Sequence, residues 1–139
     1  MSRFAAALVL AAVVGACKPA PPPAQLDPAA EVIARQFYED VRAGADLSAN
    51  VHLAHELKNP TSAEQLALFR GLIPNEPARS IQVESWDAKT EAIGTTTRLT
   101  IDYGYGDRTV VAQTALFKSP GGQEPVIVGF QVSSKAAAG

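Results

Sequence analysis

Apolar residues follow three patterns along the chain: an unbroken run near the start, helical spacing in the first half, and strict alternation in the second half. From Ile33 onward, apolar side chains recur every four residues, as on one face of a helix. Asp27-Pro28 places a capping side chain before a proline at the first helical position, and Gly44 is a typical helix stop. The pattern predicts a helix over 28–43.

Two shorter helices are expected to follow. Leu47, Val51, Ala54 and Leu57 form a helical stripe, which predicts a helix over 47–58 that ends at Asn59-Pro60. TSAE and SAEQ both read as capping boxes, so the next helix is expected to begin at Thr61 or Ser62 and to end before Pro74.

After Pro77 the period of the pattern changes from helical to two, which is typical of half-buried strands. We expect a turn over 87–92, and Val126, Val128, Phe130 and Val132 together on one face of the last strand. The predicted strands are 81–86, 93–103, 108–118 and 125–133. Segregated helices and antiparallel strands predict an α+β fold, with three N-terminal helices packed on a curved four-stranded sheet.

The first seventeen residues have the parts of an export signal. Arg3 precedes eleven apolar residues, 4–14, a run too short to span a bilayer. The stretch VGAC, which ends at Cys17, resembles the lipobox of bacterial lipoproteins. The resemblance implies cleavage before Cys17 and acylation of its sulfur, so that the bilayer is a partner of the chain. An ordinary secretory signal beside a chance cysteine is the alternative.

The sequence divides into a signal peptide (1–16), a lipidated Cys17 with a Pro/Ala-rich linker (17–27) and a globular domain (28–135). Five prolines in residues 19–28 favour extended polyproline II, which makes the linker a spacer. In the sorting rule of the lipoprotein family, the lysine after the cysteine points to the outer membrane, at its periplasmic face.

Charge and cysteine content narrow the functions further. The 139 residues carry 12 basic and 14 acidic side chains, which gives no electrostatic case for nucleic acid. One cysteine cannot form a disulfide within the chain.

The order of the predicted elements over residues 28–134 resembles the cystatin-like cone of the nuclear transport factor 2 superfamily. The resemblance implies a first helix lying in the concavity of a bent sheet, with a pocket between the two. Residues expected to line that pocket are Phe37, Val41, Leu99, Ile101, Tyr103 and Phe130. An unrelated sheet-and-helix layer is the alternative.

Few residues are candidates for chemistry. His55, Asp102 and Tyr38 are the weak catalytic candidates. His52 and His55 are three apart on a predicted helix, but two histidines leave a zinc site short of ligands, so neither a metal nor a cofactor is predicted. Alternation sends Asp102 and Tyr103 to opposite faces of their strand.

The sequence therefore predicts an envelope lipoprotein with a non-catalytic domain that binds a small ligand or another protein. A homodimer or an envelope partner would contact the outer face of the sheet, which carries Thr96, Arg98 and Thr100. The alternative is an isomerase-like or cyclase-like enzyme that uses a pocket between the first helix and the sheet.

Overall fold

The computed structural model describes residues 25–122 and 124–137, so the signal peptide, the lipobox and most of the linker lie outside the described residues. The chain folds as α+β with one antiparallel sheet in the order β1-β2-β3-β4, as the sequence predicts. The elements are α1 (Pro28–Ala43), the 3-10 helices η2 (Leu47–Ala49) and η3 (His55–Leu57), α2 (Pro60–Arg70), β1 (Ser80–Glu91), β2 (Gly94–Gly104), β3 (Arg108–Lys118) and β4 (Val126–Ala136). The prediction of three helices is wrong, because the described residues form two α-helices.

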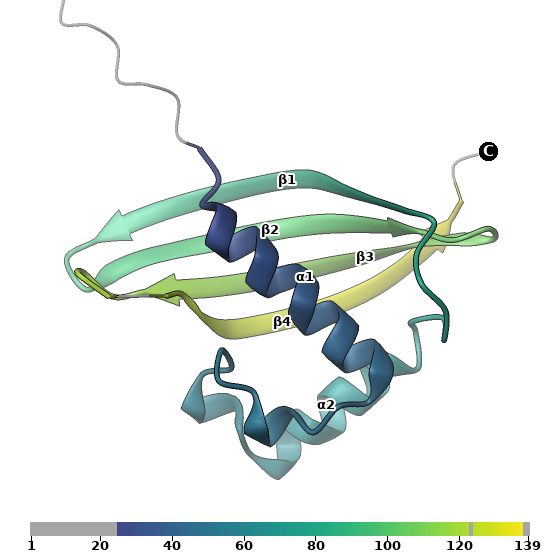
Figure 1. The fold of residues 1–139 in the computed structure, drawn as a ribbon, viewed down its shortest axis with the longest axis horizontal. Coiled ribbons are helices and arrows are strands. Elements are labelled where there is room, and N and C mark those ends of the chain that lie inside the picture. The colour runs from purple at the N-terminus through teal and green to yellow at the C-terminus, as the bar shows by residue number, and fades with distance from the viewer. Residues whose placement is uncertain (1–24, 123, 138–139) are drawn as a thin grey trace, which may run out of the picture.

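Helix α1 has the predicted boundaries and lies across one face of the sheet (Figure 1). The Asp27 side chain accepts a hydrogen bond from the Ala29 N–H at 3.0 Å, which caps the first turn. Gly44 ends the helix at a φ of 72°, a left-handed conformation that favours glycine.

The predicted helix over 47–58 is replaced by two single 3-10 turns, with a turn at Val51 and His52 and an isolated β-bridge at Leu53 between them. This segment runs beside the free edge of β4, where the Ala54 N–H donates to the Ile127 carbonyl at 2.9 Å. The Ile127 N–H donates in turn to the His52 carbonyl at 2.6 Å. Because the edge of β4 needs these partners, the segment pairs with the strand and interrupts the helical pattern.

Helix α2 begins one residue before the predicted capping boxes. Asn59 is the N-cap, and its side-chain oxygen accepts a hydrogen bond from the Ser62 N–H at 2.9 Å. Pro60 takes the first helical position. No residue of α2 is buried, although the helix carries leucines and a phenylalanine.

The expected turn over 87–92 is wrong, because β1 continues to Glu91 and pairs with β2 along its whole length. The hairpin reverses at Ala92-Ile93 instead. The pairing tolerates a β-bulge between Val83 and Ser85, which places one extra residue, Glu84, in β1.

The expected face of β4 is wrong, because a second β-bulge shifts the pairing of this strand with β3. Ala115 pairs with Gly129, but the next residue of β3, Leu116, pairs with Ile127, so Val128 is the extra residue of a bulge. Ile127 is therefore buried beside Val132, whereas Val128 is 40% exposed.

The core fills the layer between α1 and the sheet. The largest fully buried side chains of this layer are Phe37 and Tyr38 of α1, Leu99, Ile101 and Tyr103 of β2, Val110 and Leu116 of β3, and Ile127 of β4. The opposite face of the sheet is more polar: beside Val111 and Phe117, it carries Thr96, Arg98, Thr100, Asp102 and Gln113.

Candidate functional site

A cavity of about 420 Å³ lies between α2 and the end of α1. Pro60, Ala63 and Ala67 line it at helical spacing, so one face of α2 forms a wall along the length of the helix. The opposite walls come from Val41 and Gly44 at the end of α1, residues 45–48, and Leu53 and Leu57. Leu66 and Phe69 of α2 are partly buried and pack against the core, whereas Ala63 and Ala67 line the open space of the cavity.

The lining is mainly apolar, and its charged side chains are Asp46, Lys58 and Arg70. Asp46 accepts hydrogen bonds from the backbone N–H of Ser48 at 3.1 Å and from its hydroxyl at 2.6 Å. These bonds favour the ionised carboxylate and hold the pKa of Asp46 below its ordinary value. The size lies within the range of about 300–1,000 Å³ that is usual for small-molecule sites.

The chemistry of this lining suits binding better than catalysis. A general acid or base needs a pKa moved towards the working pH, and the pKa of Asp46 moves away from it. The remaining polar side chains of the lining are an asparagine and a serine whose hydroxyl is bonded to Asp46.

The six residues expected to line a pocket between the first helix and the sheet have separate places in the structure. Val41 lines the α2 cavity. Phe37 packs edge-on against Phe130, with ring centroids 4.9 Å apart. Leu99, Ile101 and Tyr103 are at most 1% exposed and belong to the core. Phe37, Leu99, Ile101 and Tyr103 fill the layer between α1 and the sheet, where the pocket was expected.

Tyr38, one of the catalytic candidates, is fully buried. Its ring stacks on that of Tyr103, with centroids 3.6 Å apart and planes 3° from parallel. Its hydroxyl shares a hydrogen bond of 2.8 Å with the hydroxyl of Tyr105. The buried hydroxyl of Tyr103 has no partner among the described residues. Burial, as the main cause, raises the pKa of all three phenols above the ordinary value for tyrosine.

The histidines do not share a helical face. His55 is exposed on η3, whereas His52 lies in the turn before Leu53, with its Nδ1 3.7 Å from a carboxylate oxygen of Glu124. Within residues 25–122 and 124–137, no three histidine, cysteine, aspartate or glutamate side chains are grouped as metal ligands.

Asp102 lies on the face of the sheet away from α1. One of its carboxylate oxygens is 3.8 Å from the ammonium nitrogen of Lys135, and the other is buried without a hydrogen-bond partner. Glu84 is the extra residue of the β1 bulge, and its protonated carboxyl group can donate a hydrogen bond to Asp102, which raises the pKa of Glu84. Asp102, Tyr38 and His55 are therefore on three different parts of the fold.

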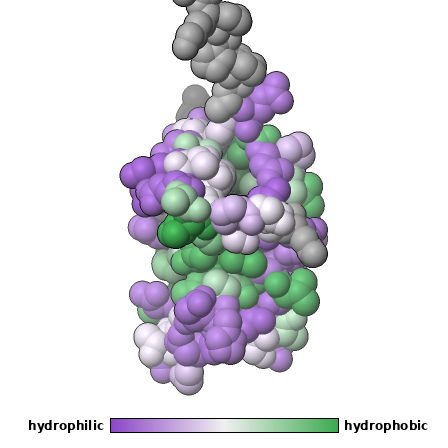
Figure 2. Space-filling model, turned by 90° about the vertical axis from the view of Figure 1, so that its left-hand side faces the viewer, coloured by the Kyte–Doolittle hydropathy of each residue, from purple (hydrophilic) through white to green (hydrophobic). Residues whose placement is uncertain are grey.

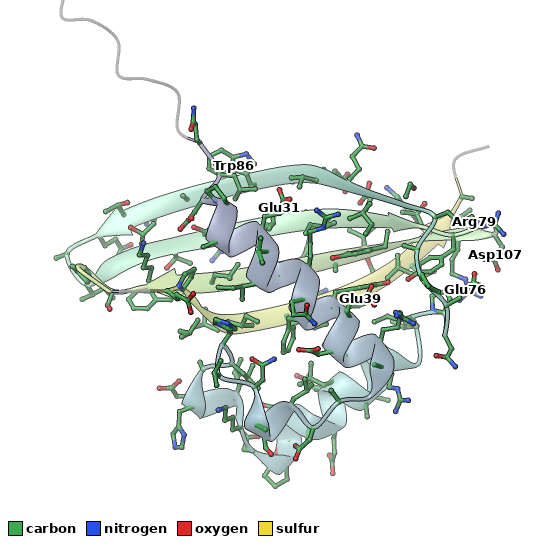
Figure 3. All side chains as sticks on the ribbon, in the orientation of Figure 1. Glu31, Glu39, Glu76, Arg79, Trp86 and Asp107 are labelled. Carbon is green, nitrogen blue, oxygen red and sulfur yellow. The ribbon has the colours of Figure 1, made fainter. Side chains whose placement is uncertain are left out.

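Charged side chains also gather at the end of the sheet where β2 and β3 meet. Figure 3 shows Arg79 and Asp107 there, with Glu76 nearby. Asp107 pairs with Arg108 at 3.2 Å, and this hydrogen bond is the main reason that the pKa of Asp107 is lowered. Positive and negative groups alternate in this cluster, so it has no strong preference for a ligand of either sign.

Two other hollows have less distinct linings. One of about 240 Å³ lies beside Trp86, near the start of α1. The other, of about 590 Å³, lies on the polar face of the sheet over the small residues Ala115 and Gly129. Neither is lined by an apolar wall as continuous as that of α2.

The cavity was not predicted, because the helical pattern after Pro60 gives no separate signal for a side of the helix that faces an open space. Leu66 lines the cavity and also packs against the core, and the small residues Ala63 and Ala67 lie on the same wall. These two small residues are the sequence feature that fits an open space beside α2.

Comparison with protein-family models, curated proteins and solved structures finds no match to this chain. None of the described helices is long and apolar enough to cross a membrane.

Proposed function

We propose that this chain is a lipid-anchored envelope protein whose domain binds a small, mainly apolar ligand in the cavity beneath α2 without transforming it. The observation that carries the binding proposal is the apolar cavity of about 420 Å³. Water inside an apolar cavity is poorly ordered, so an apolar group that displaces it gains affinity.

The anchor proposal rests on the order of residues before the domain. A basic residue, an apolar run and the small residues of VGAC precede Cys17. Two or more acyl chains on that cysteine hold a protein stably, because each buried methylene contributes about 0.8 kcal/mol. The linker then separates the domain from the bilayer at the periplasmic face of the outer membrane.

The anchor is tested by fractionation. The wild-type chain is expected in the membrane fraction, with a mass that shows acylation, and the Cys17→Ser chain is expected without the acyl mass. An unmodified thiol on the mature wild-type chain refutes the anchor.

The binding proposal is tested by filling the cavity. Ala67→Trp places an indole on the cavity wall, whereas Ala92→Trp places the same side chain in the exposed β1–β2 hairpin as a control. We expect the full-length C17S chain to bind a neutral naphthylamine fluorophore, A67W to weaken that binding at least tenfold, and A92W to leave it unchanged. Equal binding by A67W and A92W refutes the cavity as the site.

A protein-interaction function is the second candidate, and exposed apolar residues favour it. Val51, Leu68 and Ile93 are 80%, 72% and 70% exposed. Figure 2 shows a band of hydrophobic surface across one end of the molecule, between hydrophilic surfaces above and below. Exposed apolar surface of this kind often marks contacts with other proteins. Light scattering over a hundredfold range of concentration tests self-association: a constant monomer mass removes the homodimer.

A further inference from the structure

The rim of the α2 cavity carries more positive than negative charge that is available to a ligand. Lys58 and Arg70 both line the cavity, and neither takes part in an ion pair within the described residues. The one acidic side chain of the lining, Asp46, already accepts two hydrogen bonds from Ser48. A ligand that enters the cavity therefore meets two unpaired cations at its rim.

The guanidinium of Arg70 lies directly against Gly44. A side-chain carbon on Gly44 would be 2.5–2.7 Å from three guanidinium atoms, so this position depends on the absence of a side chain there. A cation near the end of α1 is also favoured by the helix dipole. The dipole of α1 does not explain the position of the Lys58 cation, because this residue precedes α2 at the other end of the cavity.

The length of the cavity follows from α2, which forms its wall. The eleven residues from Pro60 to Arg70 extend about 15 Å at 1.5 Å per residue. The volume of about 420 Å³ equals roughly fourteen water molecules at about 30 Å³ each. A single unbranched chain of roughly ten carbons matches the length of this wall and the mainly apolar lining.

We infer that the α2 cavity binds a single-chain amphiphile with an anionic head group, of the class of a medium-chain fatty acid. The guanidinium of Arg70 presents a planar pair of donors, which suits a carboxylate better than a single point charge does. The acyl chain lies along Ala63, Leu66 and Leu53 of the wall. This inference rests on the proposed ligand-binding function and specifies the chemistry of its ligand.

A matched series of probes separates the two claims. Decanoate, decanol and decyltrimethylammonium share one chain length and differ in head-group charge. Calorimetry with the full-length C17S chain is expected to show decanoate binding about fivefold more tightly than decanol, near the upper limit for a solvent-exposed ion pair. The cationic probe is expected to bind more weakly than decanol.

Arg70→Gln is expected to remove the preference for decanoate while decanol binding is retained. Arg98→Gln, on the polar face of the sheet, removes the same charge elsewhere and is expected to leave the preference intact. Lys58→Gln is expected to reduce the preference partly, which provides a second test. Added salt is expected to weaken decanoate binding and to leave decanol binding nearly unchanged.

Each outcome has a distinct meaning. Equal affinities for decanoate and decanol, or an R70Q chain that keeps the preference, overturn the anionic head group and leave the apolar cavity in place. Failure of all three probes to bind overturns the proposed ligand-binding function itself.

Discussion

Removal of the Tyr103 hydroxyl is expected to stabilise the protein. The side chain is 1% exposed, and its hydroxyl has no hydrogen-bond partner among the described residues. A buried hydroxyl without a partner costs about 1–3 kcal/mol in lost hydration. Tyr103→Phe keeps the ring that stacks on Tyr38, so we expect the free energy of unfolding to rise by about 1 kcal/mol.

Tyr38→Phe is the matched control, because it removes the same atom from the other ring of the stack. Here the hydroxyl bonds to Tyr105 at 2.8 Å, and Tyr105 is only 5% exposed. The substitution leaves the Tyr105 hydroxyl buried without that partner, so we expect a loss of about 1–2 kcal/mol. The two substitutions should therefore change stability in opposite directions.

Urea unfolding followed by the single tryptophan, Trp86, measures both changes. The slope of the unfolding free energy against urea should stay constant across the variants, so that shifts of the midpoint report stability. If Y103F destabilises the protein as much as Y38F does, the Tyr103 hydroxyl has a partner and the reasoning is refuted.

Three further predictions follow from the geometry of single groups. All three tyrosines have raised pKa values, so the folded protein should show no tyrosinate absorbance near pH 10. The stability of the protein should fall above that pH, because the tyrosines of the unfolded chain ionise there. Gradual titration of tyrosine in the folded state would contradict this prediction. Gly44→Ala should destabilise the protein by about 1 kcal/mol in urea unfolding, because a side chain strains the left-handed φ of this residue, and an unchanged midpoint would argue against that conformation. The pKa of Glu84, followed by carboxyl NMR, should fall in Asp102→Asn and rise further in Lys135→Gln. The stability gained from the shared proton is present at low pH and is lost as the pH rises through the folded pKa of Glu84. An Asp102→Asn variant in which Glu84 keeps its wild-type pKa would exclude the pairing.

The parts of the fold that depend on local signals could be predicted from the sequence. The boundaries of α1 match because a cap at Asp27, an apolar period and a glycine stop at Gly44 all act within one short stretch of chain. The third strand also has the predicted bounds, 108–118, because β-branched residues lie between two glycine-containing loops.

The parts that depend on distant partners could not be predicted. Residues 47–58 have a helical pattern, yet Ala54 and His52 bond to Ile127, more than seventy positions away. The face of β4 changes at Val128 because its neighbour β3 fixes the register. Alternation within one strand contains no information on such a bulge.

Most of the lining of the candidate site could not be predicted either. Val41 is the one residue of the expected pocket that lines the α2 cavity, and the rest of the lining comes from the loop after α1 and from α2. Whether these segments close against each other or leave a space depends on side-chain volumes across two elements. Periodicity along one helix does not report that volume.

The presence of a ligand in the α2 cavity is tested most directly by nuclear Overhauser effects between the chain of bound decanol and the protein. We expect contacts from the decanol methylenes to the methyl groups of Leu53, Leu57 and Leu66, which line the cavity. Contacts confined to exposed methyl groups such as those of Val51 and Ile93, or no contacts at saturating decanol, would contradict this expectation.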